Sequence, residues 1–404
     1  MKKFAVMIGL LVLFVAAASF AQIPSGAWYR GDLHSHSTYS DGDSPVAEVI
    51  AYAEARGFDF FTITDHDVFM SGNPLHWNDT SYHSSTMAIL YGVEWTTPKG
   101  HANIWAAAPF DYSPLWRANR ERNALSACNA AHDNGALFSI NHPESIFVST
   151  WDYPVSDCID SVEVWNGMYR FPSLNRWAGH NFWDNVLKSG RRITGVGGSD
   201  THHIKKWQSV LLGQGNPTTW VFAAEKSAQA ILAGIKAGHV SISYAPDAPR
   251  LEFIADATGD GVYDALMGDS VEEFSDDVSF RISVVNVNGK PASDGGEIIE
   301  LGARTVENIA SGRLSIDAIL HTLSMKMTSC RHDIYAMGIF KNGTLFKAWL
   351  LIGAIDEITF SDNPAPRTYY RVELRGKPAV TPLQQVLYGR VIAISNPIYF
   401  AYAQ

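Results

Sequence analysis

Histidines and carboxylates recur in short groups along the first half of the chain. The first group holds His34 and His36, with Asp41 five residues later. On a β-strand, alternate side chains point to the same face, so the two imidazoles would stand side by side. Imidazole and carboxylate ligands without thiolate suit zinc, manganese or iron. A lone pair of this kind is weak evidence, because core histidines more often form ordinary hydrogen bonds, so the inference depends on the later groups.

The later groups extend the same chemistry to several further positions. The candidate metal ligands, each at or just after a predicted strand end, are His34, His36, Asp41, His66, Glu94, His101, His142, Asp200 and His202. One structural zinc needs four ligands, so nine candidates predict two or three divalent transition metals (Zn, Mn or Fe) in one cleft, sharing a bridging carboxylate. Such clusters activate water and neutralise an oxyanion or a phosphate.

Short apolar runs alternate with amphipathic segments between residues 26 and 243. Strands are expected at 26–33, 58–63, 87–93, 136–140, 161–164, 193–197 and 239–243, and helices at 45–56, 116–133, 174–188 and 225–237. This alternation predicts an α/β fold with a mostly parallel sheet and crossover helices. At least five strand ends carry candidate ligands. That number favours a β/α barrel, because an open doubly wound sheet gathers ligands at one or two switch points.

The pattern changes after about residue 249. Residues 250–254 and 280–285 alternate with period two, and turn signals such as Asn342-Gly343 recur. We expect a small β-rich, sandwich-like accessory domain over residues 249–404. Residues 305–331 are neither clearly alternating nor clearly capped and are left unassigned.

The first 21 residues are typical of a secretory signal peptide. Two lysines precede an uncharged apolar run, and Ser19-Phe20-Ala21 is a small-x-small cleavage site. We therefore expect export, to the periplasm or the exterior, with no membrane contact after cleavage and a metallohydrolase domain over residues 22–248. The alternative is an uncleaved anchor, although the run is a little short for a bilayer span of about 20 residues.

The composition limits the partners. The chain has 404 residues and a formal net charge of −10, and no segment is basic enough to indicate a stable nucleic-acid partner. Three cysteines (Cys128, Cys158 and Cys330) are too few for a disulfide framework. A Cys128–Cys158 bond and three structural thiols both remain open.

Five motifs in order resemble those of the polymerase and histidinol phosphatase (PHP) superfamily. They are His34-x-His36-Ser-x-x-Ser-Asp41-Gly42, Thr64-Asp65-His66, Gly92-Val93-Glu94, Asn141-His142-Pro143 and Gly198-Ser199-Asp200-x-His202. The similarity covers residues 28–245 and implies a distorted (β/α)7 PHP-type barrel with two or three metals at the carboxyl ends of the strands. The signal peptide, residues 162–166 and the β-rich tail resemble a secreted branch that includes aryl-carbamate hydrolases.

The resemblance also implies a role for each candidate ligand. One metal would be held by His34, His36, Glu94 and Asp200, a second by Glu94, His101 and His142, and a third by Asp41, His66 and His202. Asp41 stands where some relatives have a histidine. A metal-bound hydroxide would attack phosphorus or a carbonyl carbon, so no Ser or Cys nucleophile is needed, and no Gly-x-Ser-x-Gly elbow is present.

Other polar residues near the motifs have two interpretations each. Asp65 and His202 are the candidate catalytic residues, although Asp65 would equally orient a ligand imidazole from behind. Glu163 and Asn166 either line the pocket or form ordinary strand-end contacts. His76 and His83 lie in a polar loop and are expected to be solvent-exposed.

Three functions follow from these observations. The leading hypothesis is a secreted metal-dependent phosphoesterase acting on small molecules. The second keeps the metal site but cleaves a carboxylic or carbamic ester, because the sequence offers few fixed cations for a phosphate. The third is a catalytically inactive protein that binds a surface glycan through its β-rich domain.

Overall fold

A computed structural model describes most of the chain. The described residues are 23–144, 150–167, 179–205, 213–285, 297–316, 319, 334–353, 356–376 and 391–402. The predicted signal peptide and Cys330 lie outside them, as does most of the unassigned stretch 305–331. Among the described residues, no helix combines the length and the apolar character needed to cross a bilayer.

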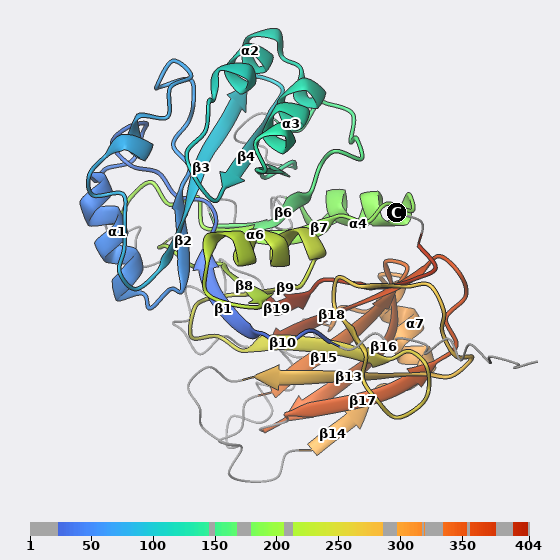
Figure 1. Cartoon of the computed structure of the whole chain (residues 1–404). Helices are drawn as coiled ribbons and strands as arrows, with labels where there is room; N and C mark the ends of the chain where they lie inside the picture. The colour runs from blue at the N-terminus through green and yellow to red at the C-terminus, as the bar shows by residue number, and fades with distance from the viewer. Residues whose placement is uncertain are drawn as a thin grey trace, which may run out of the picture.

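The N-terminal region, strands β1 to β9, alternates strands and helices much as expected. Its strands are β1 (Ala27–Asp32), β2 (Phe60–Ile63), β3 (Ala88–Thr97), β4 (Gly100–Ala106), β5 (Leu137–Ile140), β6 (Ser161–Asn166), β7 (Thr194–Gly198), β8 (Thr218–Ala223) and β9 (Val240–Ser243). Its helices are α1 (Val46–Ala55), the 3-10 helix η1 (Leu75–Asn78), α2 (Ser113–Glu121), α3 (Ala124–Asp133), α4 (His180–Lys188) and α6 (Ala228–Ala237). Figure 1 shows this region in its upper part.

The sheet of the N-terminal region is mixed rather than mostly parallel. Its strand order is β9-β8-β1-β2-β3-β4-β5-β6-β7. The runs β1-β2-β3 and β5-β6-β7 are parallel, whereas β4, β8 and β9 run antiparallel to their neighbours. The prediction failed at β4 because Lys99-Gly100 lets the chain fold straight back: Thr97 pairs with Gly100, which has a φ of +134°. A tight hairpin thus joins β3 to β4, a strand that was not predicted.

Two helices replace the single helix expected over 116–133. Arg122 adopts a left-handed conformation with φ +53°, which ends α2. Asn123 then accepts a hydrogen bond from the Ser126 N–H at 3.0 Å and caps α3. Asn is among the preferred N-cap residues, so the new start is encoded locally.

The C-terminal region, strands β10 to β20, is rich in strands as expected. They are β10 (Arg250–Asp256), β11 (Ala265–Leu266), β12 (Ser270–Val271), β13 (Val278–Val285), β14 (Glu297–Glu300), β15 (Ile334–Lys341), β16 (Thr344–Ile352), β17 (Glu357–Asp362), β18 (Thr368–Gly376), β19 (Val391–Ser395) and β20 (Ile398–Phe400). One helix, α7 (Ala303–Ala310), begins just before the stretch left unassigned.

Two sheets face each other in the C-terminal region. One has the order β11-β10-β13-β17, and the other contains β14-β16-β15-β18-β19. Along β13, buried and partly exposed residues alternate, and Phe280 from its buried face lies 4.7 Å from the rings of both Phe360 and Tyr370. Phe360 belongs to the first sheet and Tyr370 to the second, so the shared apolar core lies between the two sheets.

The two regions share one continuous sheet. Strand β19 pairs antiparallel with β9, with Ile394 opposite Ile242, and so links the C-terminal strands to those of the N-terminal region. Figure 1 shows β19 beside β8 and β9. The domain boundary at residue 249 remains a prediction, because backbone pairing crosses it.

A buried ion-pair network adds a second link. The Arg371 guanidinium on β18 is fully buried and donates at 3.1 Å to both carboxylate oxygens of Asp184 on α4. It also donates at 2.6 Å to Glu373, whose same oxygen lies 2.8 Å from His180 Nε2. The network therefore ties α4 of the N-terminal region to β18 of the C-terminal region.

Cys128 and Cys158 form a disulfide. Cys128 is buried on α3, and Cys158 lies in the segment that leads into β6. The bond resolves the choice between a disulfide and free thiols, and it anchors α3 to the strand that carries Glu163.

Candidate functional site

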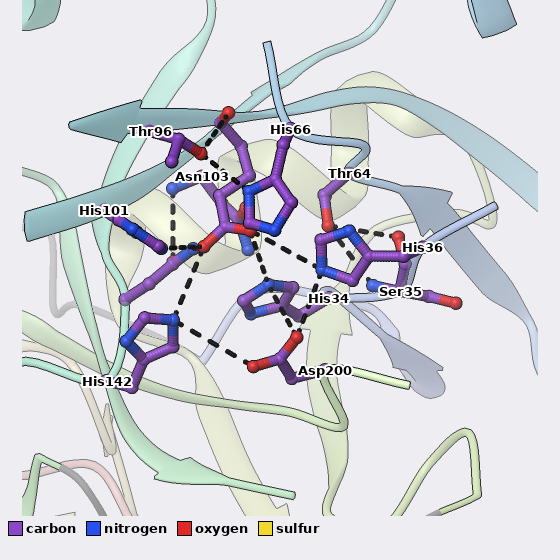
Figure 2. Close-up of polar contacts among 12 residues, drawn as sticks. His34, Ser35, His36, Thr64, His66, Thr96, His101, Asn103, His142 and Asp200 are labelled. Carbon is purple, nitrogen blue, oxygen red and sulfur yellow. Dashed lines mark hydrogen bonds and ion pairs between the residues drawn. The ribbon is translucent and has the colours of Figure 1, made fainter. Parts of the chain in front are cut away.

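The nine candidate ligands converge at one end of the N-terminal sheet. His34 and His36 follow β1, His66 follows β2, and Asp200 follows β7. Isolated parallel β-bridges, one between Ser35 and Thr201 and one between His66 and Glu94, extend the backbone pairing beyond the ends of these strands. Figure 2 shows the imidazoles of His34, His36, His66, His101 and His142 pointing toward one another, with Asp200 among them. Because parallel strands bring their carboxyl ends to one edge, local sequence pattern was enough to predict this convergence.

Glu94 lies at the centre of the cluster and is completely buried. It stands inside β3 rather than at a strand end, because β3 continues into the hairpin with β4. Five histidine nitrogens face its carboxylate, at 2.9 Å (His66 Nδ1), 3.1 Å (His101 Nδ1), 3.4 Å (His34 Nε2), 3.4 Å (His142 Nε2) and 3.5 Å (His36 Nε2). Burial alone would raise the pKa of Glu94, but the charges of His66, His34 and His101 hold it well below its usual range.

The hairpin explains why His101 meets Glu94. Thr96 lies opposite His101 in the β3-β4 register, and Glu94 is two residues before Thr96. Side chains two apart on a strand share a face, so Glu94 and His101 are diagonal neighbours.

Asp200 is the second inner carboxylate. Its Oδ1 lies 3.1 Å from His36 Nε2 and 3.4 Å from His34 Nε2, and its Oδ2 lies 4.0 Å from His142 Nε2. Asp200 and His142 have positive φ angles of +54° and +24°. Such backbone conformations are costly for residues other than glycine and concentrate at functional sites.

Asp41 forms the outer, more open side of the cluster. Its side chain is 38% exposed, and its carboxylate lies 3.3 Å from His202 Nε2 and 3.7 Å from both His36 Nδ1 and His66 Nε2. Burial and the neighbouring charge of His202 lower the pKa of His36 to about 4. Burial would also lower the pKa of His202, but its hydrogen bond with Asp41 and the charge of Asp200 raise it to about 9. Because the Asp41 side chain is partly exposed, solvent reaches the cluster beside Asp41 and His202.

The donor set fits more than one metal ion. Four groups of ligand atoms lie within 4.8 Å of one another: His36, Asp41, His66 and His202; His34, His142 and Asp200; His34, His36 and Glu94; and His66, Glu94 and His101. His34 Nε2 and Glu94 Oε2 are buried and lie 3.4 Å apart, and neither forms a well-aligned hydrogen bond among the described residues. Unpartnered buried polar atoms are costly, and a shared cation would satisfy both.

Asp65, a candidate catalytic residue, supports the loop that carries Asp41. It is fully buried and accepts hydrogen bonds from the Ser37 N–H at 2.7 Å and from the hydroxyls of Ser37 and Ser40 at 2.6 Å each. Its catalytic role remains a prediction, and these contacts favour a positioning role.

His76 is buried, so the expectation that it is solvent-exposed was wrong. Its Nε2 lies 2.9 Å from the Gly92 carbonyl, and its Nδ1 lies 3.5 Å from Asp65. The helix η1, which carries His76, packs this polar loop against β3. His83 is exposed, as expected.

Asp67 is a further buried carboxylate beside the cluster. It accepts hydrogen bonds from the Thr96 N–H at 3.0 Å, the Tyr112 hydroxyl at 3.1 Å and the Asn119 amide at 2.9 Å. Burial raises its pKa to about 7. These contacts fix the turn that follows His66.

Sequence reasoning left the roles of Glu163 and Asn166 open. The structure buries both on β6, with the Glu163 carboxylate 3.0 Å from His34 Nδ1 and 2.8 Å from the Asn166 amide. The sequence signal was a carboxylate inside an otherwise apolar strand, where an uncompensated charge would be costly.

Comparison with known proteins supports the motif assignment in part. The PHP domain family model matches residues 32–138. This segment carries His34, His36, Asp41, His66, Glu94 and His101 and ends before His142. No curated protein matches the chain.

The solved structures that are similar to the chain include the following three. A two-domain protein from Bacteroides vulgatus that contains a predicted PHP-like metal-dependent phosphoesterase is 16% identical, with 93% of this chain and 98% of that chain covered and a TM-score of 0.42. An amidohydrolase from Chromobacterium violaceum with bound sulfate is 17% identical, with 43% and 88% covered and a TM-score of 0.28. A protein from Bifidobacterium adolescentis, to which metal-dependent phosphoesterase activity has been assigned without proof, is 13% identical. The alignment covers 44% of this chain and 88% of that chain, with a TM-score of 0.30. Likenesses this distant carry no functional argument, so the interpretation rests on the cluster and the matched segment.

Proposed function

We propose that this protein is a metal-dependent hydrolase of PHP type that cleaves small-molecule phosphoesters at the cluster around Glu94. The observation that carries the proposal is the set of four overlapping ligand groups. His34, His36, His66 and Glu94 each belong to two of these groups. The proposal includes export of the mature chain, suggested by residues 1–21, and an accessory role for residues 249–404. It also includes a closed (β/α)7 barrel, which the bridge between Ser35 and Thr201 supports.

Each part of the cluster has a role in this proposal. His34, His36 and Asp200 would hold one divalent metal, His101 and His142 a second, and Glu94 would bridge the two. Asp41, His66 and His202 would hold a third. Bound metals of this kind polarise a substrate oxygen and lower the pKa of water.

The chain's own groups would orient the substrate and move protons. The substrate would enter beside Asp41, since Glu94 and His34 are closed off from solvent. When no third metal is bound, His202 Nε2, 3.3 Å from Asp41 and on the open side, would exchange a proton with the leaving oxygen.

The metal requirement is directly measurable. We expect purified mature protein to contain more than one equivalent of Zn, Mn or Fe by elemental analysis. Chelation should abolish hydrolysis and lower the thermal unfolding midpoint, because a ligand bound only to the folded state stabilises it. Adding back the metal should restore both. Full activity in metal-free protein would contradict the proposal.

Carboxylic or carbamic ester hydrolysis is a second candidate function. Across the described ranges, the cluster carboxylates form ion pairs with histidines only and not with Lys or Arg. Phe69 is 60% exposed and its ring stacks on His66 at 5.8 Å. An uncharged ester with an apolar group would suit such a rim.

A parallel substrate screen separates the candidates. Metal-loaded protein would be given aryl phosphomonoesters, phosphodiesters, carboxylic esters and carbamates that share one leaving group. We expect the highest kcat/KM for a phosphoester. A higher value for a carboxylic or carbamic ester would favour the second candidate, and no turnover of any substrate would favour an inactive binding protein.

A further inference from the structure

We propose that Glu163 is a positioning residue that sets the tautomer of His34 and fixes the backbone of His142, so that both imidazoles face the metal cluster. This inference rests on the proposed function, because it assigns Glu163 a role toward the same metals. Glu163 lies on β6 and is 2% exposed.

The first contact of Glu163 determines which nitrogen of His34 is available. Glu163 Oε1 lies 3.0 Å from His34 Nδ1, and a carboxylate can only accept a hydrogen bond there. His34 must therefore carry a proton on Nδ1 and can offer its lone pair on Nε2. That atom lies 3.4 Å from both Glu94 Oε2 and Asp200 Oδ1, inside the cluster. A carboxylate behind a ligand imidazole also increases its basicity.

The second oxygen of Glu163 acts on the neighbouring strand end. Glu163 Oε2 accepts the His142 N–H at 3.0 Å and the Asn166 amide at 2.8 Å. His142 has a φ of +24°, a conformation that needs outside support. The hydrogen bond to its N–H supplies such support and directs the imidazole so that Nε2 lies 3.4 Å from Glu94 Oε1. One carboxylate thus controls two candidate ligands.

Gly198 provides the room for this arrangement. A Cβ at this position on β7 would lie 2.2 Å from Glu163 Oε1 and 2.6 Å from the His34 Cβ. Both distances are far inside van der Waals contact, so any larger residue would displace the carboxylate from His34. The glycine in the motif Gly198-Ser199-Asp200 is therefore explained by the space that Glu163 and His34 need.

A merely structural role for Glu163 makes a different prediction. If the carboxylate only satisfied buried donors, its replacement would lower stability and leave metal affinity unchanged. The decisive measurement is therefore Zn²⁺ affinity, obtained by competition with a chromophoric chelator, with thermal unfolding of the metal-free protein recorded alongside.

The main test is Glu163→Gln, which keeps the shape and removes the charge. We expect Zn²⁺ to bind about 10- to 100-fold more weakly, the usual effect of losing a carboxylate behind a ligand histidine. Gly198→Ala is the second variant, because it leaves the carboxylate chemically intact but its Cβ would crowd both the Glu163 carboxylate and the His34 Cβ. We expect a loss of Zn²⁺ affinity of similar size. This variant also keeps the inference testable if Glu163→Gln does not fold.

The matched control is Asp160→Asn. Asp160 lies at the other end of β6 and pairs with His132 at 2.8 Å, so it repeats the carboxylate-histidine pair away from the cluster. Its Zn²⁺ affinity should equal that of the wild type. Wild-type affinity in folded Glu163→Gln or Gly198→Ala would overturn this inference, whereas a wild-type protein that binds none of Zn²⁺, Mn²⁺ and Fe²⁺ would overturn the proposed function itself.

Discussion

Replacing Glu94 with glutamine is expected to lower kcat/KM for the best substrate by more than about 100-fold and to reduce the bound metal content. The glutamine side chain has nearly the same shape, but it loses the negative charge that five histidine nitrogens face at 2.9–3.5 Å. Loss of a carboxylate that only supports a ligand costs about 10- to 100-fold, so loss of the proposed bridging ligand should cost more. Steady-state kinetics and elemental analysis of the same preparation would measure both effects.

The matched control for this experiment is Glu48→Gln. Glu48 is about half exposed and pairs with Lys205 on the surface, so the same chemical change there should leave kcat/KM and metal content unaltered. Wild-type turnover by Glu94→Gln would show that hydrolysis takes place elsewhere on the protein.

The largest expected effect on stability is that of Arg371→Met. Arg371 is fully buried and binds Asp184 and Glu373, so removal of its charge would leave buried Asp184 without the cation it pairs with and would weaken the neutralisation of Glu373, which Arg375 also contacts. Breaking a buried ion pair from one side costs about 3–5 kcal/mol of unfolding free energy. Urea unfolding monitored by Trp fluorescence would measure the change.

Lys205→Met is the control for the stability experiment. Lys205 and Glu48 form an ion pair whose side chains are 52% and 47% exposed, and such pairs contribute less than about 1 kcal/mol. If Arg371→Met unfolded at the same urea concentration as this control, the buried network would contribute nothing to the link between α4 and β18.

Most of the candidate site was predictable from local sequence. The positions of His34, His66, His142 and Asp200 follow from one rule, since each comes directly after an apolar run and such runs form neighbouring strands. The structure brings these four residues into the cluster for this reason, whereas Glu94 and His101 join it through the β3-β4 hairpin. The residues that could be predicted are those whose contacts depend on strand ends alone.

The remainder depended on contacts that no local pattern encodes. Glu163 meets His34 across 129 residues of sequence, and nothing near either residue indicates the pairing. His76 was misjudged because a polar loop can pack against a strand when its polar atoms find partners, here the Gly92 carbonyl opposite His76 Nε2. Strand β4 (Gly100–Ala106) was not predicted, so its antiparallel pairing with β3 was missed.

The pairing of β19 with β9 has a consequence for the order of folding. During synthesis, β9 leaves the ribosome long before residues 391–395, so one edge of the N-terminal sheet waits for its partner. An open edge strand is a template for pairing with another chain, and contacts between distant segments form slowly. If the N-terminal sheet forms before residues 391–395 join it, a sheet that already carries most of the metal ligands would have an exposed β9 edge, and a chaperone that shields strand edges would act at that stage.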